Sequence, residues 1–215
     1  MKLLRIFFTK TGEAAYISHL DLQRVMARAL RISGLPVWYS QGFNPHIYMS
    51  FALPLPLMME SVAESVDVKT ESELEDFSAF VAPLNTALPR GIEASAIAAP
   101  VHDTGSITAA IYRYCYPDTK DVLTILKRYG QLQEALVVRK TKRSEEEIDL
   151  KAVVPQIAIS PEGNTCFEVR LPAGNKLHYS PALLTSFIER AFGASAQQAR
   201  VTRVQVLTKD GEPFC

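Results

Sequence analysis

Short apolar runs and one long amphipathic segment dominate the first fifty residues. Residues 3–8 form an apolar run that predicts a buried strand, and it stops at the turn Lys10-Thr11-Gly12. From Ser18 to about Ser33 apolar residues recur at helical spacing, and Gly34 follows as a typical C-terminal signal. This stretch therefore predicts a helix whose buried face is formed by Leu22, Val25, Met26, Ala29 and Leu30.

The order of the remaining elements predicts the fold class. The first half shows strand patterns at residues 37–40, 47–53, 62–69 and 92–99 and a second helix pattern at 72–88. Without the small strand 37–40, the order is β-α-β-β-α-β, which is the ferredoxin-like (split βαβ) unit. The second half repeats this order, with strands at 107–116, 135–140, 153–160, 166–171 and 201–207 and helices at 118–129 and 180–192. We predict an α+β protein of two tandem ferredoxin-like units with antiparallel sheets, over residues 1–104 and 105–215.

Composition and charge restrict the class of partner. The 215 residues are 47% hydrophobic, which is enough for a sizeable core, and 23 basic residues balance 23 acidic ones. The charges are unevenly placed, since residues 61–104 hold two Lys or Arg against eight Asp or Glu. The balance excludes binding through bulk charge but permits a local basic surface.

Apolar run lengths and cysteine spacing indicate a cytoplasmic protein that does not contact a membrane. No run approaches the roughly 20 residues of a membrane span, and Lys10 interrupts the first run too early for a signal peptide. The three cysteines are isolated and do not have the spacing of a zinc finger, a thioredoxin motif or a radical-enzyme iron–sulfur cluster. We expect Cys115 to be packed in the interior and Cys215 to be mobile.

The motif Ser18-His19-Leu20-Asp21 has a structural and a chemical interpretation. Ser18 with Asp21 three residues later matches a capping box, which begins a helix. Capping does not explain His19, whose position in the first helical turn disfavours the imidazolium form. A neutral imidazole there can act as a base, a metal ligand or a hydrogen-bond partner.

The loop Gln41-Gly42-Phe43-Asn44-Pro45-His46 carries more chemical groups than a turn requires. Glycine and Asn-Pro satisfy the geometry of a hairpin connection by themselves. Gln41, Asn44 and His46 add hydrogen-bonding groups, and Phe43 adds a surface for stacking. This set of residues suits the recognition of an exposed nucleobase or another planar polar ligand.

In a split βαβ sheet, these two motifs can lie close together. His19, Asp21 and His46 would then converge, and they are our candidate acid–base residues if the chain is an enzyme. Two histidines and a carboxylate can also bind zinc or iron, but the spacing of a metal motif is missing. We therefore assign no metal and no cofactor.

Two basic clusters are candidate phosphate-binding surfaces. Arg24, Arg28 and Arg31 fall on the helix face opposite the apolar one, where a solvated face is the structural alternative. Arg139, Lys140, Lys142 and Arg143 precede three glutamates, so a self-neutralising hairpin tip is an equal alternative to a nucleic-acid-binding loop. The chain carries no P-loop, no dinucleotide-binding glycine motif and no nucleophile elbow. Nucleotide hydrolysis, dinucleotide redox chemistry and serine hydrolysis therefore lose their usual support in the sequence.

The two motifs together resemble the bacterial radical-SAM-linked domain of unknown function. The matching residues are Lys10, Gly12, Ser18, His19, Leu20, Asp21 and the run Tyr39 to His46, and the I-D-L-K within residues 140–151 resembles the second half of that family. Met58 departs from the pattern, because the family commonly has glycine there. The resemblance implies a radical SAM partner enzyme and gives no substrate. Our candidate ligand-binding residues are Lys10, Ser18, Ser40, Gln41, Phe43, Asn44 and His46.

Three functional hypotheses follow. The first is a non-catalytic accessory protein that binds a substrate, plausibly RNA, and presents it to a radical SAM enzyme. The second is an RNA-cleaving or RNA-modifying enzyme that uses His19, Asp21 and His46. The third is a purely structural partner of the radical SAM protein, with Trp38, Tyr48, Phe51 and residues 53–59 as apolar contacts.

Overall fold

The chain divides into two compact units. A computed structural model describes residues 1–140, 145–161, 163, 165–175 and 177–215. The first unit comprises residues 1–106 together with Phe214 and Cys215, and the second comprises residues 107–213. The sequence places the boundary between residues 104 and 105, and it does not assign Phe214 and Cys215 to the first unit.

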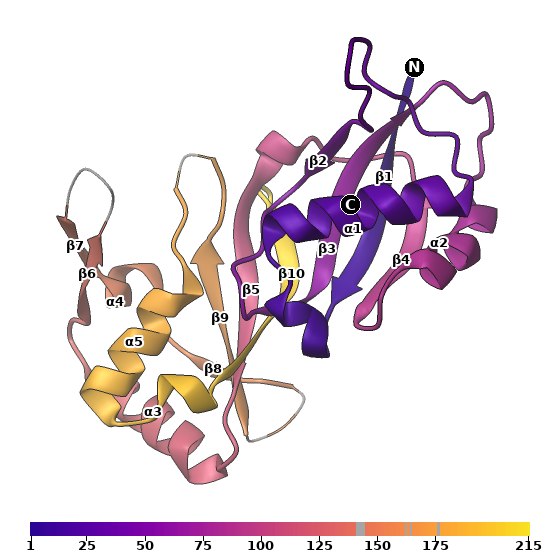
Figure 1. The fold of residues 1–215 in the computed structure, drawn as a ribbon. Coiled ribbons are helices and arrows are strands. Elements are labelled where there is room, and N and C mark those ends of the chain that lie inside the picture. The colour runs from indigo at the N-terminus through magenta and orange to yellow at the C-terminus, as the bar shows by residue number, and fades with distance from the viewer. Residues whose placement is uncertain (141–144, 162, 164, 176) are drawn as a thin grey trace. The chain divides into compact units, whose positions relative to one another are not determined.

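The first unit is an antiparallel sheet with two α-helices over one face (Figure 1). The strands lie in the order β4-β1-β3-β2. Its elements are β1 (Lys2–Lys10), η1 (Gly12–Tyr16), α1 (His19–Ser33), β2 (Met49–Phe51), β3 (Glu60–Thr70), η2 (Ser78–Phe80), α2 (Val81–Ala87), β4 (Ile92–Ala98) and η3 (Thr104–Ser106).

The core of the first unit lies between α1 and the sheet. Four of the five residues expected on the buried face of α1 are buried, and Val25 is half-buried against the same core. They face alternate residues of β1, since Leu4, Ile6 and Phe8 point to the same side of a strand. Ser18 caps the helix and Gly34 ends it in the left-handed conformation, as predicted.

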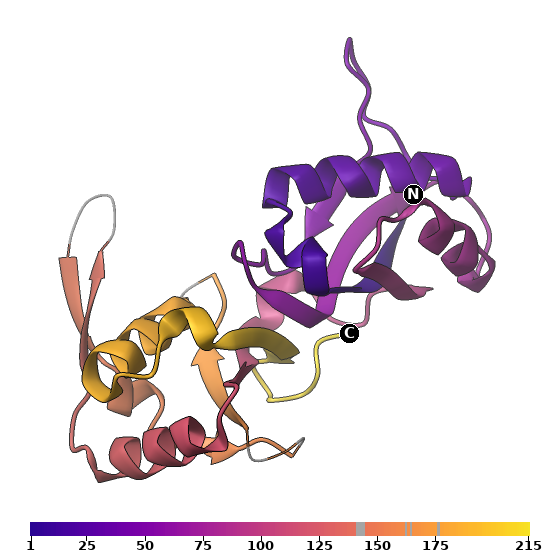
Figure 2. The same cartoon turned by 60° about the horizontal axis from the view of Figure 1, so that its bottom comes forward.

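The second unit combines a four-stranded antiparallel sheet with a separate hairpin (Figure 2). The sheet order is β10-β5-β9-β8, and β6 pairs with β7 outside it. The elements are β5 (Ile107–Cys115), α3 (Thr119–Gln131), β6 (Leu136–Lys140), β7 (Glu145–Asp149), α4 (Leu150–Val153), β8 (Ala158–Ile159), β9 (Cys166–Pro172), α5 (Pro181–Phe192), η4 (Ala196–Gln198) and β10 (Arg200–Thr208). Helices α3 and α5 contact each other, and Tyr112, Tyr114 and Phe167 are buried in the sheet.

The mixed α/β class and the antiparallel pairing agree with the prediction, but three elements differ. Residues 37–40 form only isolated bridges, because Val37 pairs with Thr70 and Tyr39 with Ile47. The predicted helix 72–88 shrinks to η2 and α2, since Asp76 binds the backbone N–H of Ser78 and competes with helical hydrogen bonds. The predicted strand 153–160 is confirmed only as the two-residue strand β8 (Ala158–Ile159), and its first residue, Val153, instead ends the short helix α4 that Asp149 caps.

No helix in the described part of the chain has both the length and the apolar character needed to cross a membrane.

Candidate functional site

Ser18 and Asp21 form the capping pair that the sequence predicts. The backbone N–H of Asp21 donates to Ser18 Oγ at 3.2 Å, and the Ser18 hydroxyl donates to Asp21 Oδ2 at 2.7 Å. Arg24 Nη1 donates to the other carboxylate oxygen of Asp21 at 2.7 Å. The hydrogen bond from Ser18 and then the one from Arg24 hold the pKa of Asp21 below its usual value of 3.8. Both oxygens of Asp21 are therefore engaged with residues other than His19.

His19 is held by Gln23 and Phe51. Its Nε2 lies 3.1 Å from Nε2 of Gln23, one turn along α1. An amide nitrogen donates, so Nε2 of His19 is the acceptor in this hydrogen bond. The imidazole also meets the ring of Phe51 edge-on, with centroids 5.0 Å apart. An amide and an aromatic ring therefore orient His19, and the described contacts of Asp21 are with Ser18 and Arg24.

The loop from Gln41 to His46 is a hairpin with a closed base. The backbone N–H of Ser40 donates to the carbonyl of His46 at 2.8 Å, and the N–H of His46 donates to Ser40 Oγ at 3.1 Å. The Ser40 hydroxyl also lies 2.8 Å from Nδ1 of His46. At the tip, Gly42 has a φ of 131°, and the Phe43 side chain is fully exposed. This hairpin projects from the first unit (Figure 2) and presents Phe43 to solvent.

The two histidine motifs do not touch in the described part of the chain. His46 contacts Ser40 and Asn44, whereas His19 contacts Gln23 and Phe51. The described residues also contain no group of three His, Cys, Asp or Glu side chains suited to a metal ion. The catalytic use of His19, Asp21 and His46 stays a prediction without a shared contact to support it.

A lysine that the sequence did not single out joins the base of the hairpin. Lys69 Nζ lies 4.2 Å from the ring centroid of Tyr48 and 5.6 Å from that of Trp38. The backbone N–H of Trp38 donates to the carbonyl of Lys69 at 2.7 Å, so β3 fixes the position of the aromatic pair. The register between the hairpin arm and β3 produces this cluster, and a single sequence does not reveal that register.

The candidate basic residues have different surroundings. Arg24 is engaged by Asp21, whereas Arg28 and Arg31 are exposed on α1. Arg139 stacks over Tyr179 at 5.6 Å from its ring centroid, and its Nη1 lies 3.7 Å from Glu146. That ion pair is one element of the self-neutralising tip. Lys142 and Arg143 lie outside the described residues, as does the side chain of Lys140.

Lys10 is 1% exposed, and its Nζ donates to the carbonyl of Ala15 at 3.1 Å. A buried ammonium group needs such partners, so this geometry indicates a structural role. Ligand binding by Lys10 stays a prediction.

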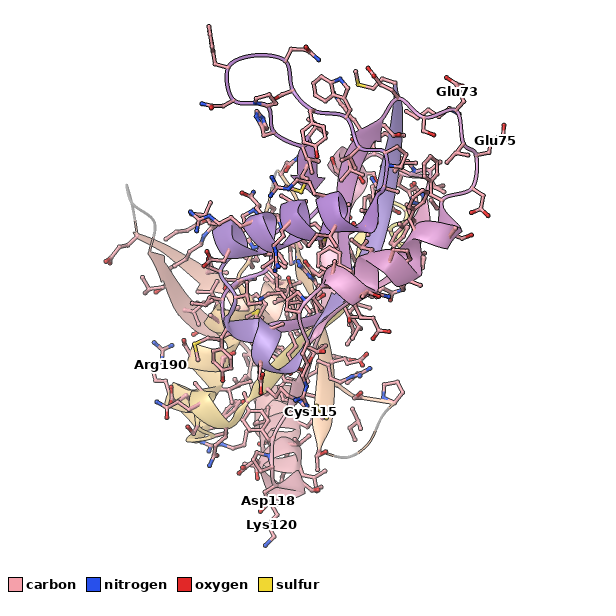
Figure 3. All side chains as sticks on the ribbon, turned by 45° about the vertical axis from the view of Figure 1, so that its right-hand side comes forward. Glu73, Glu75, Cys115, Asp118, Lys120 and Arg190 are labelled. Carbon is pink, nitrogen blue, oxygen red and sulfur yellow. A yellow bond between two sulfur atoms is a disulfide. The ribbon has the colours of Figure 1, made fainter. Side chains whose placement is uncertain are left out.

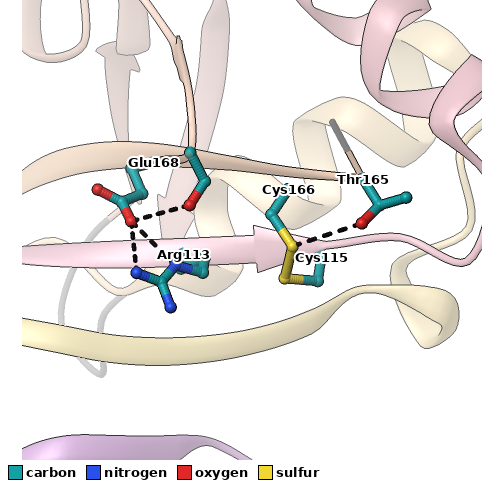
Figure 4. The surroundings of a disulfide bond; sticks show 6 residues. Arg113, Cys115, Thr165, Cys166 and Glu168 are labelled. Carbon is teal, nitrogen blue, oxygen red and sulfur yellow. Dashed lines mark hydrogen bonds and ion pairs between the residues drawn. A yellow bond between two sulfur atoms is a disulfide. The ribbon is translucent and has the colours of Figure 1, made fainter. Parts of the chain in front are cut away.

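The cysteine expectations are wrong in two respects. Cys115 and Cys166 lie opposite each other in the β5–β9 pair and form a disulfide (Figure 4). The two residues are 51 positions apart, so spacing gives no sign of the pairing. Cys215 is exposed, yet its backbone N–H donates to Nδ1 of His102 at 3.2 Å and its carbonyl accepts from Arg5 at 2.8 Å. The residue is therefore anchored, because sequence position alone does not decide whether a backbone is held.

Comparison with known proteins places the chain in a family. A family model described as "Uncharacterized protein conserved in bacteria (DUF2344)" matches residues 3–181. The chain belongs to this family. The match covers both motifs, the hairpin and most of the second unit, which confirms the resemblance at the level of an uncharacterised bacterial family. A search of curated proteins finds no match to this member of DUF2344.

Proposed function

We propose that this chain is a non-catalytic accessory protein that binds single-stranded RNA and presents it to a radical SAM enzyme. The observation that carries the proposal is the hairpin with Phe43 fully exposed at its tip. Leaving a large aromatic ring in water is unfavourable, and the base of the hairpin fixes the ring there through Ser40 and His46. A ring held in this way is suited to stacking on an unpaired base.

The groups around the hairpin complete a binding surface for a single strand. Trp38 and Tyr48 provide further aromatic faces beside the ammonium group of Lys69. Gln41 and Asn44 are exposed next to Phe43 and can read the edges of a base. Arg28 and Arg31, exposed on α1 of the same unit, can supply phosphate contacts.

The partner part of the proposal rests on the radical-SAM-linked resemblance of the motifs around His19 and His46. The number and pairing of the cysteines support the role of a non-catalytic accessory protein, because two of the three cysteines form a disulfide. The cysteines therefore do not supply the set of thiolates that a radical SAM cluster requires. In this proposal the radical chemistry belongs to another chain.

We also infer that each unit is ferredoxin-like, which extends the fold class beyond mixed α/β. We number the strands of each unit in chain order and treat the β6–β7 hairpin and α4 as an insertion in the second unit. The strands of both sheets then lie side by side in the order 4-1-3-2. An experimental structure of the full chain tests this inference, since a different strand order in either sheet contradicts it.

The binding test uses the full chain and a fluorescently labelled single-stranded RNA of mixed sequence. We expect the anisotropy titration to show binding at 50 mM salt and weaker binding at 200 mM salt. Phe43→Ala is expected to weaken binding by about fivefold or more, the loss typical of one stacked base. Tyr16→Ala is the matched control, because Tyr16 is an exposed aromatic residue on another element.

The basic residues are tested in the same titration. Arg28→Gln with Arg31→Gln is expected to flatten the salt dependence, since each lost phosphate contact reduces its slope by about one. Arg139→Ala with Arg143→Ala tests the second basic cluster in the same way. If the wild-type chain does not bind RNA at low salt, alone or with the copurified partner, the RNA part of the proposal is wrong. Copurification of a radical SAM protein from the native cell, without RNA, would favour the purely structural alternative.

A further inference from the structure

A cavity of about 610 Å³ lies in the first unit at the junction of β1, η1, α2 and β4. It is separate from the hairpin, and none of the candidate residues of the sequence analysis lines it. Glu13, Arg90 and Glu93 bring charge to its wall, and Thr9 and Thr11 bring hydroxyl groups. Small-molecule sites are usually concave pockets of about 300–1,000 Å³ in which a few polar groups accompany an apolar lining.

The charged groups of this cavity are free to bind a ligand. Among the described residues, Glu13, Arg90 and Glu93 make no ion pair with any other side chain. The hydroxyl groups of Thr9 and Thr11 likewise have no hydrogen-bond partner in the described ranges. The residues that line the cavity therefore carry two carboxylates, one guanidinium and two hydroxyls, and no other described side chain neutralises the three charges.

The backbone fixes the positions from which these groups project. Thr9 and Glu93 are directly opposite in the β1–β4 pair, so their side chains lie on the same side of the sheet. The backbone N–H of Thr11 donates to the carbonyl of Gly91 at 2.7 Å and joins the two sides of the cavity. Gly91 is required for this approach, because a Cβ there would lie 2.4 Å from the carbonyl oxygen of Thr11.

We propose that this cavity binds a free dibasic α-amino acid, of which L-lysine is the simplest probe. A guanidinium group complements a carboxylate, so Arg90 receives the α-carboxylate. Glu13 and Glu93 receive the two ammonium groups, one α and one terminal. The ligand carries two positive charges and one negative charge, which is the complement of the cavity wall. This site does not depend on the RNA proposal, because it uses different residues and a different ligand.

The ligand requirement is tested by titrating the isotopically labelled full chain and following backbone amide shifts. L-Lysine is expected to bind in about the millimolar range, since solvent-accessible ion pairs contribute little each. L-Norleucine lacks the terminal ammonium and cadaverine lacks the carboxylate, so each is expected to bind about fivefold more weakly. The shifts are expected at residues 9–13 and 89–93.

Variants assign the ligand charges to the side chains. Glu93→Gln is expected to reduce the affinity for lysine and for cadaverine, which both carry two ammonium groups. Norleucine binding is expected to stay close to wild type if Glu93 receives the terminal ammonium, and to weaken if it receives the α-ammonium. Arg90→Gln is expected to make the affinities for lysine and cadaverine equal, because the carboxylate of lysine then has no guanidinium partner. Glu75→Gln is the matched control, because Glu75 is an exposed acidic residue outside the cavity (Figure 3). The control is expected to bind lysine like wild type.

Three results overturn the proposal, and none requires a variant to fold. Lysine and norleucine binding with equal affinity excludes the role of the second ammonium. Equal binding of lysine and cadaverine excludes the carboxylate site at Arg90. Shifts outside the cavity, or no shifts at 20-fold the expected dissociation constant, exclude the site itself.

Discussion

Arg5 binds both carboxylate oxygens of Asp67 in the interior of the first unit. Arg5 Nε lies 2.7 Å from Oδ1 and Nη2 lies 2.9 Å from Oδ2, and both residues are buried. Nη1 donates to the carbonyls of His102 and Cys215, and the guanidinium carbon lies 4.2 Å from the ring centroid of Phe214. One buried cation thus connects β1, β3, the segment after β4 and residues 214–215.

Replacement of Arg5 is expected to destabilise the protein strongly. Arg5→Met leaves the carboxylate of Asp67 buried without its partner, which typically costs about 3–5 kcal/mol. Urea denaturation measures the loss, with exposed Arg31→Met as the control for removal of a surface charge. Arg5→Met combined with Asp67→Leu is expected to cost less than the sum of the two single changes. Equal stability of the Arg5→Met and Arg31→Met variants would contradict this account.

Glycine at position 58 is expected to stabilise the chain. Met58 has a φ of 65°, in the left-handed region that side chains other than glycine rarely adopt. Its side chain is exposed, so Met58→Gly loses little packing and relieves about 1 kcal/mol of backbone strain. The free energy of unfolding in urea measures the gain. Met58→Ala keeps the Cβ and is the control that should show no comparable gain.

The disulfide predicts a definite number of reactive thiols. Without reductant the denatured chain should show one free thiol, from Cys215, and after reduction it should show three. Cys115→Ser is expected to lower the free energy of unfolding by about 2–4 kcal/mol, because the cross-link limits the unfolded chain. Cys215→Ser is the control, since that residue forms no disulfide. Three thiols before reduction would show that the strands pair without the bond.

His178 is expected to make stability fall in mild acid. Burial, and then the positive charges of Arg203 and Arg139, lower the pKa of His178 below its usual value of 6.5. The unfolded chain therefore takes up a proton at a higher pH than the folded chain, so the folded state loses stability as pH falls through 6.5. Unfolding free energies at pH 7.5 and 5.5 measure this loss. His178→Gln should reduce it, and an unchanged loss in that variant would exclude His178 as its source.

Local signals predicted most elements whose positions depend on nearby residues. The capping pair of Ser18 and Asp21 and the left-handed Gly34 bound α1, and Pro181 with Gly193 bounds α5. These signals act within a few residues, so a sequence displays them directly. The predicted helix at 72–88 is confirmed only from Ser78 onward, because side chains in the acidic segment before it bind the adjacent backbone.

Fewer contacts of the candidate site could be predicted from the sequence, because many of them join residues that are far apart along the chain. The hairpin and its closing residues Ser40 and His46 are close in sequence, and their residue types indicate the turn. Lys69 reaches Tyr48 through the pairing of β2 with β3, and Cys115 meets Cys166 through the pairing of β5 with β9. Each of these contacts depends on strand register, which spacing along one sequence does not determine.

Because Phe214 and Cys215 belong to the first unit, a fragment that reproduces this unit must include them. A fragment containing only residues 1–106 would expose the guanidinium of Arg5 that Phe214 covers and would lose its bond to Cys215. Supplying that fragment with a short peptide carrying Phe-Cys would restore both interactions in trans. The first unit is thus discontinuous along the chain, since it includes two residues that follow the whole second unit.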